Sequence, residues 1–321
     1  MPFRLSGMVV LFGALLITVS LPGCVSSQEN SINGKIVFQS DRDGNYDLYI
    51  MNPDGSDQRN LTNLPVSSNT PNSNTGPAPS PDGRHVAFVS NRNGNDEIYV
   101  IDIESGVQSN LTKHEANDYS PTWSPDGKYI AFISDRDAIL VNAERDIWTN
   151  NIYIMDADGS NTWRLTNDNK TDGYAGLAWS FDGKQLAFCL SSTTPYGGYF
   201  SKGIHILTLS DTSRTRLTFD QPVQQCSPKW SPDGEHILYL VTGSKLSNIY
   251  VMKSDGTNQQ GLSEDPDIYD ISPFWSPDGK QIVFSSRRDG SYHVYVMDAD
   301  GTNLVQLTNG PGDDTFPVWL P

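Results

Sequence analysis

Carboxylate and amide side chains recur at two places in this 321-residue sequence where they could bind a cation. The first is the stretch DRDGNYD, which spaces Asp41, Asp43, Asn45 and Asp47 like the start of a calcium loop. The later glutamate and the flanking helices of an EF-hand do not follow this stretch. It therefore predicts either calcium ligands or a hairpin whose aspartates bond the loop backbone, and the hairpin is the favoured interpretation.

The second place is a position five residues before a repeated slot that holds tryptophan in five of its six copies. The residues at this position are Asn74, Asp118, Tyr174, Gln225, Asp270 and Asp314. Gathered carboxylates repel one another, which raises their pKa values unless a cation or a basic group lies among them. Their oxygens suit calcium, magnesium or a basic side chain of a partner. The column predicts a binding site for one of these, or else solvated aspartates that cap strands.

Catalytic motifs receive little support from the sequence. The stretch HEAND at His114 resembles the start of the zinc motif HExxH, but its fifth residue is Asp118 and no helix is expected there. The nucleophile motif GxSxG is absent, and the five histidines are scattered. These patterns favour a binding protein over an enzyme.

The elements that must position these residues come from an internal repeat. The phrase WSPDGKYIAFISDRD begins at Trp123, and close copies begin at Trp179, Trp230 and Trp275. Each unit alternates in hydrophobicity with a period of two and is divided by PDG and ADGS turns. Each unit therefore predicts four antiparallel strands, and repeat periods of this size are typical of propeller blades.

The first unit lacks its first strand, and the C-terminus supplies it. Joined end to end, the terminal VWLP and the early NGKIVFQS read like TWSPDGKYIAFIS, with Trp319 in the tryptophan slot. The sequence therefore predicts an all-β fold, a six-bladed β-propeller of four-stranded antiparallel blades. The C-terminal strand completes blade one, so the ring leaves no open sheet edge.

These repeats resemble the TolB-type six-bladed β-propeller, the WD40-like PD40 repeat family, over residues 33–321. The resemblance implies a cell-envelope or periplasmic interaction protein. TolB proteins carry an extra α/β domain before the propeller, whereas residues 24–32 here predict only a tether, so the whole TolB role does not carry over. Related propellers also occur in enzymes, and the alternative is a carbohydrate-active enzyme, a metal-dependent polysaccharide lyase or hydrolase.

Residues 1–23 have the pattern of a signal peptide, with Arg4 before an apolar run. The run ends in LPGC, which resembles the lipobox of bacterial lipoproteins. That resemblance implies cleavage before Cys24 and lipid attachment to it, in the outer membrane facing the periplasm of a diderm or at the cell surface otherwise. The alternative is an ordinary secretory signal with an unrelated cysteine.

The charge of the exported chain limits its partners. Removing residues 1–23 deletes Arg4 and leaves 21 basic and 38 acidic residues, a net charge of −17. This charge excludes nucleic acid and favours a cation or a basic partner. We expect a monomer that meets the membrane only through its lipid. Cys189 and Cys226 remain, and two buried thiols are favoured over one disulfide.

Loop lengths predict which face of the ring binds a ligand. The turns between first and second strands and between third and fourth strands are short, whereas the opposite face receives the long insertions after Thr62, Ser134 and Leu190. Variable loops on a fixed scaffold are the usual site of binding. The sequence thus predicts a non-catalytic propeller that binds a protein, peptide or glycan at this long-loop face and the channel mouth.

Overall fold

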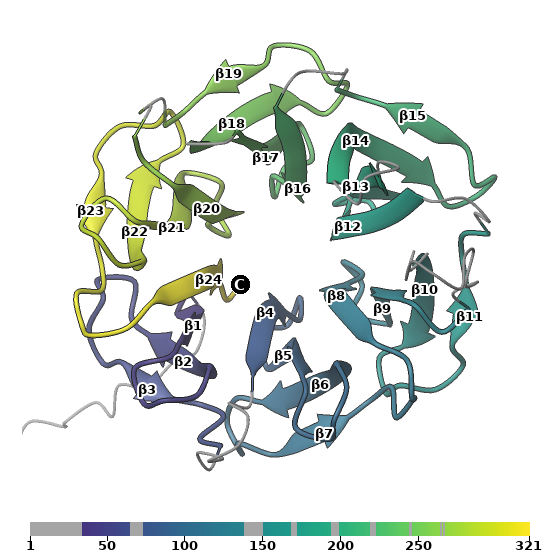
Figure 1. Ribbon diagram of the computed structural model, residues 1–321, viewed down its shortest axis with the longest axis horizontal. Coiled ribbons are helices and arrows are strands. Elements are labelled where there is room, and N and C mark those ends of the chain that lie inside the picture. Colours follow the sequence, from purple (N-terminus) through teal and green to yellow (C-terminus); the bar gives the residue numbers. More distant parts are fainter. Residues whose placement is uncertain are drawn as a thin grey trace, which may run out of the picture. The chain divides into compact units, whose positions relative to one another are not determined.

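The computed structural model describes residues 34–64, 73–137, 150–167, 172–193, 199–218, 223–243, 246–263, 265 and 267–321. Its compact unit, Ile32–Pro321, contains six four-stranded antiparallel sheets arranged in a ring (Figure 1). The predicted six-bladed propeller is therefore confirmed. The part of the chain described here includes no helix long and apolar enough to cross a membrane. Residues 1–23 and Cys24 lie outside the described residues.

The first strand of each blade lies innermost, around the central channel (Figure 1). In order from blade one to blade six, these strands are β24 (Asp314–Trp319), β4 (Asn74–Pro79), β8 (Asp118–Trp123), β12 (Asp172–Trp179), β16 (Gln224–Trp230) and β20 (Asp270–Trp275). The second strands are β1 (Ile36–Ser40), β5 (His85–Ser90), β9 (Tyr129–Ser134), β13 (Gln185–Thr193), β17 (His236–Thr242) and β21 (Gln281–Ser286).

The third and fourth strands complete each blade toward the outside of the ring. The third strands are β2 (Asp47–Met51), β6 (Glu97–Asp102), β10 (Asn151–Asp156), β14 (Tyr199–Thr208), β18 (Ser247–Lys253) and β22 (His293–Asp298). The fourth strands are β3 (Arg59–Asn60), β7 (Gln108–Asn110), β11 (Trp163–Arg164), β15 (Arg214–Arg216), β19 (Gln260–Gly261) and β23 (Val305–Gln306).

Blade one is assembled from both parts of the chain, as predicted. Strand β24 pairs antiparallel with β1, with Ile36 opposite Trp319 and Ser40 opposite Asp314. The backbone nitrogen of Gly34 also donates to the carbonyl oxygen of Leu320 at 3.0 Å. The sheet order β24-β1-β2-β3 closes the ring.

The hydrophobic core is divided into six clusters, each between two neighbouring blades. In β1, Val37 packs toward blade two, whereas Ile36 and Phe38 pack toward blade six. Because both faces of a blade are covered, the middle strands are buried along their whole length instead of alternating between core and solvent. The tryptophan slots contribute to these clusters, as Trp319 does between blades six and one.

The short PDG turns are closed by their own aspartates. In blade three, Asp126 accepts hydrogen bonds from the Ser124 hydroxyl at 2.7 Å and from the backbone nitrogen of Lys128 at 3.1 Å. These bonds lower the pKa of Asp126 to about 2. Gly127 has a φ of 69°, which the turn requires and which glycine adopts without strain. Asp126 therefore has a structural role in closing its turn.

Candidate functional site

The column predicted at the channel mouth consists of buried side chains at or near the start of the innermost strands. Their exposed fractions are 0% for Asn74 and Asp118, 2% for Tyr174, 7% for Gln225, 1% for Asp270 and 0% for Asp314. The predicted requirement for a basic group among the carboxylates is met, and the chain itself supplies it.

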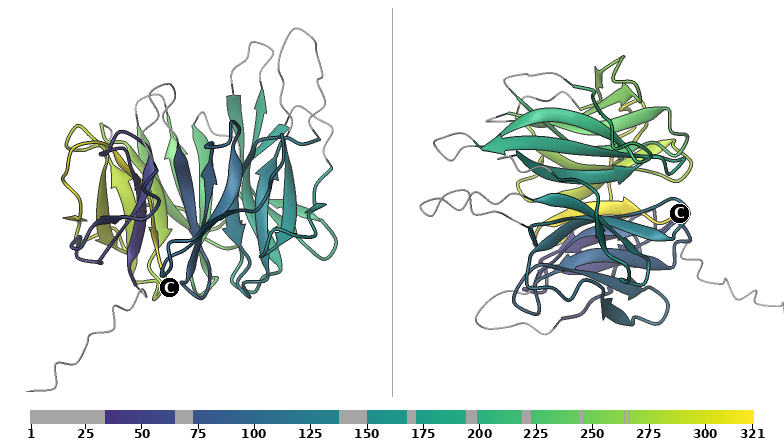
Figure 2. Two further views of the ribbon diagram at one scale, coloured as in Figure 1. Left: turned by 90° about the horizontal axis from the view of Figure 1, so that it is seen from below. Right: turned by 90° about the vertical axis from the view of Figure 1, so that its right-hand side faces the viewer.

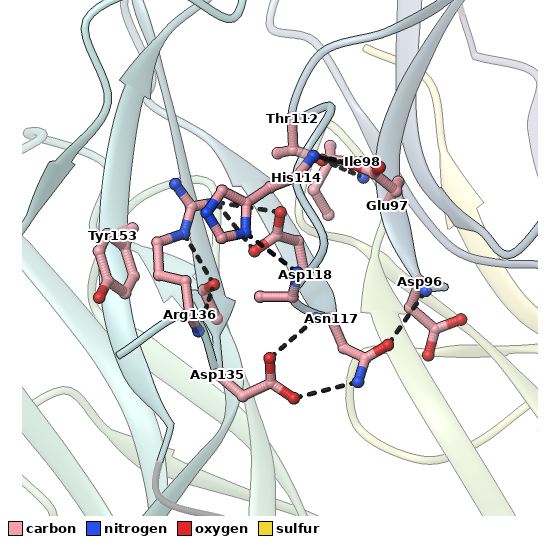
Figure 3. Close-up of polar contacts among 12 residues, drawn as sticks. Asp96, Glu97, Ile98, Thr112, His114, Asn117, Asp118, Asp135, Arg136 and Tyr153 are labelled. Atoms are coloured by element: carbon pink, nitrogen blue, oxygen red, sulfur yellow. Dashed lines mark hydrogen bonds and ion pairs between the residues drawn. The ribbon is translucent and has the colours of Figure 1, made fainter. Parts of the chain in front are cut away.

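The basic group in blade three is an arginine that follows the second strand. Asp118 accepts hydrogen bonds from Arg136 at 2.9 and 3.0 Å (Figure 3). The same guanidinium donates to the Ser134 hydroxyl at 2.9 Å and lies over the rings of Phe132 and Tyr153, 5.1 and 4.8 Å from their centroids. Burial raises the pKa of Asp118, and the bonds to Ser134 and Arg136 oppose that rise. We call this unit the arginine clamp.

The arginine clamp recurs in blades one and six. Arg42 donates to Asp314 at 2.7 Å, and Arg288 donates to Asp270 at 3.2 Å. In blade one the clamp joins a residue near the start of the described chain to one near its end. One carboxylate oxygen of Asp270 and one of Asp314 are buried without a hydrogen-bond partner among the residues described here. Cation binding at the column therefore stays a prediction, and these two oxygens are the candidate ligands.

Blade two carries an amide where the other clamps have a carboxylate. Asn74 accepts from Arg92 at 3.0 Å and donates from its nitrogen to Asp47 of blade one at 3.2 Å. An aspartate at this position would face the Asp47 carboxylate and be repelled by it. The amide therefore suits a place between a donor and an acceptor. Burial lowers the pKa of Arg92, which has no carboxylate partner in its own blade.

Blades four and five hold their innermost strands differently. Tyr174 and Gln225 occupy the column, and a disulfide joins Cys189 of β13 to Cys226 of β16, with 5.1 Å between their Cα atoms. The favoured expectation of two free thiols was therefore wrong. The two cysteines lie 37 residues apart, and the sequence did not show that neighbouring blades place them side by side.

The predicted calcium loop is a closed hairpin in which each side chain has a different task. Asp47 accepts from the Thr62 hydroxyl at 2.6 Å, Asp43 accepts from the Tyr49 hydroxyl, and Asp41 accepts from the backbone nitrogen of Asp313 at 2.8 Å. Asn45 donates to the carbonyl oxygen of Leu64 at 3.1 Å. The structure does not bring these four side chains together as one ligand set, because each is engaged in closing the loop or joining it to the next blade.

The HEAND stretch also forms a loop. The backbone nitrogen of His114 donates to Glu97 at 3.2 Å, and its ring nitrogen Nδ1 accepts from the backbone nitrogen of Ala116 at 3.0 Å. The neighbouring Asp118 belongs to the arginine clamp and does not act as a partner of this histidine. This stretch is therefore a polar loop, and no helix forms there, as expected.

Two partly buried carboxylates that the sequence did not single out lie beside the clamp of blade three. Asn117 connects them: it accepts from the backbone nitrogen of Asp96 at 3.2 Å and donates to Asp135 at 2.8 and 3.0 Å (Figure 3). Burial raises the pKa of Asp96, and the Asp135 carboxylate raises it further. Neither carboxylate forms an ion pair with a cation in the described part of the chain. We call Asp96 and Asp135 the acidic pair.

The acidic pair lies at the long-loop end of the ring, where second strands pass to third strands and fourth strands to the next blade. A signal for it was available in the repeat, because Asp96 stands where blade one has Tyr46 and blade six has Tyr292. The insertions predicted to carry binding are mostly outside the described residues, which omit 65–72, 138–149 and 194–198.

Comparison with known proteins identifies the repeat. Residues 63–140 and 209–321, more than half of the chain, match the family described as TolB beta propeller domain, PD40. An "Uncharacterized peptidase YuxL" of Bacillus subtilis is 34% identical over 104 residues. That match covers 32% of this chain and only 14% of that protein's length.

Solved structures share the ring. TolB from Acinetobacter baumannii superposes with a TM-score of 0.71 at 23% identity, covering 90% of this chain and 67% of that one. A putative TolB from Agrobacterium tumefaciens superposes with a TM-score of 0.63 at 20% identity, covering 90% and 99%. Identities this low establish the fold alone.

Proposed function

The chain belongs to the TolB β-propeller family, and from this premise we propose that it is a non-catalytic binding protein of the cell envelope. It binds a basic segment of a protein partner at the long-loop end of its ring. The family supports protein interaction as the general role of such a ring. The docking face, the partner's charge and the tether are our proposal.

The acidic pair is the observation that carries this proposal. Asp96 and Asp135 are partly buried and mutually repulsive, and no cation among the described residues pairs with them. A lysine or arginine placed between them would relieve that repulsion and gain charge-assisted hydrogen bonds. The net charge of −17 would also accelerate the approach of a basic partner.

The tether is proposed to be the lipidated Cys24 followed by residues 25–32. A lipid at Cys24 would hold the ring at a membrane surface without a spanning helix. Exchange of Cys24→Ala should release the protein from the membrane fraction or block its processing. A membrane fraction that is unchanged by this exchange would contradict the tether and leave the docking proposal standing.

The docking proposal is tested by capture from an envelope extract with the purified full chain as bait. We expect Asp96→Asn/Asp135→Asn to lose at least tenfold of a captured protein, because both carboxylates contact its basic segment. The captured protein should also elute at moderate salt. A glycan as the captured species would contradict the protein partner.

The matched control removes two charges from the opposite end of the ring. Asp54 and Asp158 are exposed aspartates in turns between third and fourth strands. Asp54→Asn/Asp158→Asn changes the net charge by the same amount and should leave capture unchanged. Equal losses in the two double variants would show that only overall charge matters, and would overturn the assignment to the acidic pair.

A further inference from the structure

A cavity lies at the other end of the channel, where the short turns between first and second strands meet. Its volume is about 320 Å³, and all six blades contribute to its wall. The wall consists mainly of proline, tryptophan, alanine and serine residues from the ends of the innermost strands and the turns that follow. Its rim is exposed at Pro81, Phe181, Pro277 and Pro321, so the cavity opens to solvent there. The C-terminus marks this face in Figure 2.

Lys229 carries the only charged side chain among the described residues that line this cavity, and Pro321, whose carboxyl group ends the printed sequence, also lines it. Lys229 precedes Trp230 in β16, and the corresponding residues of the other blades are uncharged. These residues are Ala78, Thr122, Ala178, Phe274 and Val318. Five blades therefore build the same position without a charge, so packing of the ring does not require one.

The Lys229 ammonium has no counter-charge among the residues that the structure describes. No carboxylate in the described part of the chain lies within ion-pair distance of it, and no hydrogen-bond acceptor in that part reaches it. Its nearest aromatic contact is the Phe274 ring, whose centroid lies 5.9 Å away. Burial alone lowers the pKa of Lys229 to about 8. Lys229 is half-buried in the wall, and an unpaired ammonium in largely apolar surroundings is unfavourable.

The cavity also has an unusual rim in blade four. Phe181 stands where the turns of the other five blades have proline, and 64% of its surface is exposed. An exposed aromatic side chain beside an apolar opening provides a surface for stacking an apolar group. Three turn aspartates on this face, Asp126, Asp182 and Asp278, each pair with the lysine two residues later. Asp233 instead lies beside Glu235 and His236.

We propose that this cavity binds an organic carboxylate with an apolar body. The carboxylate pairs with Lys229, while the body packs against tryptophan and proline rings and against Phe181. Two sources share this chemistry, a small free acid and the C-terminal carboxylate of a polypeptide ending in an apolar residue. The site lies at the opposite end of the ring from the acidic pair, and it does not depend on the docking function proposed above.

Calorimetry on the full chain with matched acids and amides tests the proposal. The small probes are N-acetylphenylalanine and its amide, and the long probes are a ten-residue peptide ending in phenylalanine with a free or an amidated C-terminus. We expect each acid to bind at least tenfold more tightly than its amide. Equal affinity of the small acid and the long acid assigns the site to free acids, and tighter binding of the long acid assigns it to polypeptide C-termini.

Two variants make the test specific to the lysine. Lys229→Met keeps a long unbranched side chain without charge, and it should abolish the preference for acids while the fold remains intact in thermal melts. Lys184→Met removes an exposed lysine from the same face and should keep the preference. The proposal is overturned if the wild type binds acids and amides equally, if it binds neither at millimolar concentration, or if Lys229→Met retains the preference.

Discussion

The clamped aspartates of the column and Lys229 of the short-turn cavity are charged side chains that the fold treats in opposite ways. At the long-loop end, the carboxylates of Asp118, Asp270 and Asp314 each have an arginine of the same blade. At the short-turn end, Lys229 has no counter-charge in the described part of the chain. The three clamped aspartates have their counter-charges within the chain itself, whereas Lys229 gains one only when an anion enters. We infer that clamps build the ring and that an unpaired charge marks a place for a ligand.

The largest expected effect is the loss of one clamp. Arg136→Met leaves Asp118 buried beside no cation, and breaking such a pair costs about 3–5 kcal/mol of unfolding free energy. Chemical denaturation of the two proteins measures this difference. Adding Asp118→Asn should recover part of the loss, because the buried charge is then removed. A loss below about 1 kcal/mol would mean that the clamp contributes no more than a surface ion pair.

Replacing the corresponding arginine of blade two tests whether the carboxylate sets the value of the clamp. Arg92→Met leaves the neutral amide of Asn74 behind, so its cost should be smaller than that of Arg136→Met by about 1–2 kcal/mol. Both arginines lie over a phenylalanine and a tyrosine ring, so the lost stacking is matched. Equal losses would show that stacking, and not the carboxylate, sets the value of the clamp.

Blades four and five should lose stability when the disulfide between them is removed. Cys189→Ala/Cys226→Ala removes the cross-link between them, and removal of such a bond typically costs about 2–4 kcal/mol. Hydrogen exchange should quicken in β12–β19 more than in the clamped blades, since those blades have no arginine at the corresponding position. Uniform quickening around the ring would break the distinction between clamped and cross-linked blades.

Removing the unpaired charge should stabilise the protein. The folded-state pKa of Lys229 is about 8, below its ordinary value of 10.5, so the folded state disfavours the proton that the unfolded state keeps. Below pH 8, Lys229→Met should therefore be more stable than the wild type by up to about 3 kcal/mol. The advantage should shrink as pH rises from 8 to 10.5, and melts across that range measure it. A destabilised variant would indicate a hidden partner of the lysine.

The smallest expected effect concerns calcium at the clamped end. If the clamps are complete, 1 mM calcium should shift the melting temperature of the wild type by less than about 1 °C, because weak or absent binding adds little stability. A larger shift that Asp270→Asn/Asp314→Asn removes would support the predicted cation site at the two oxygens that accept no hydrogen bond. That result would break the comparison between the two ends.

The fold was predictable because its information is local and repeated. The alternating strands, the PDG turns and the completion of NGKIVFQS by VWLP predicted the blades and their closure, and β24 pairs with β1 accordingly. The tryptophans were also predictable as packing residues, since a repeated large apolar side chain has to meet a repeated neighbour.

The environment of the column was less predictable. The sequence indicated that the carboxylates would repel one another, but it did not show which basic group neutralises them. That group is an arginine 18 residues later in blades three and six, after the second strand has returned to the same end of the blade. The fixed spacing was a readable signal. The disulfide and Lys229 were not readable, because each depends on how one blade faces the next and on which side chains enclose a cavity.

Closure by β24 also sets the order in which the ring can form. Strand β1 precedes the other described strands of the ring and its partner β24 follows them, so β1 has a free edge until β24 has been made. Blade one is therefore a poor place to nucleate folding, because its contacts span nearly the whole chain. During that interval the β24 of another copy could pair with the waiting β1. A domain-swapped dimer is thus the misassembled form that this architecture invites at high concentration.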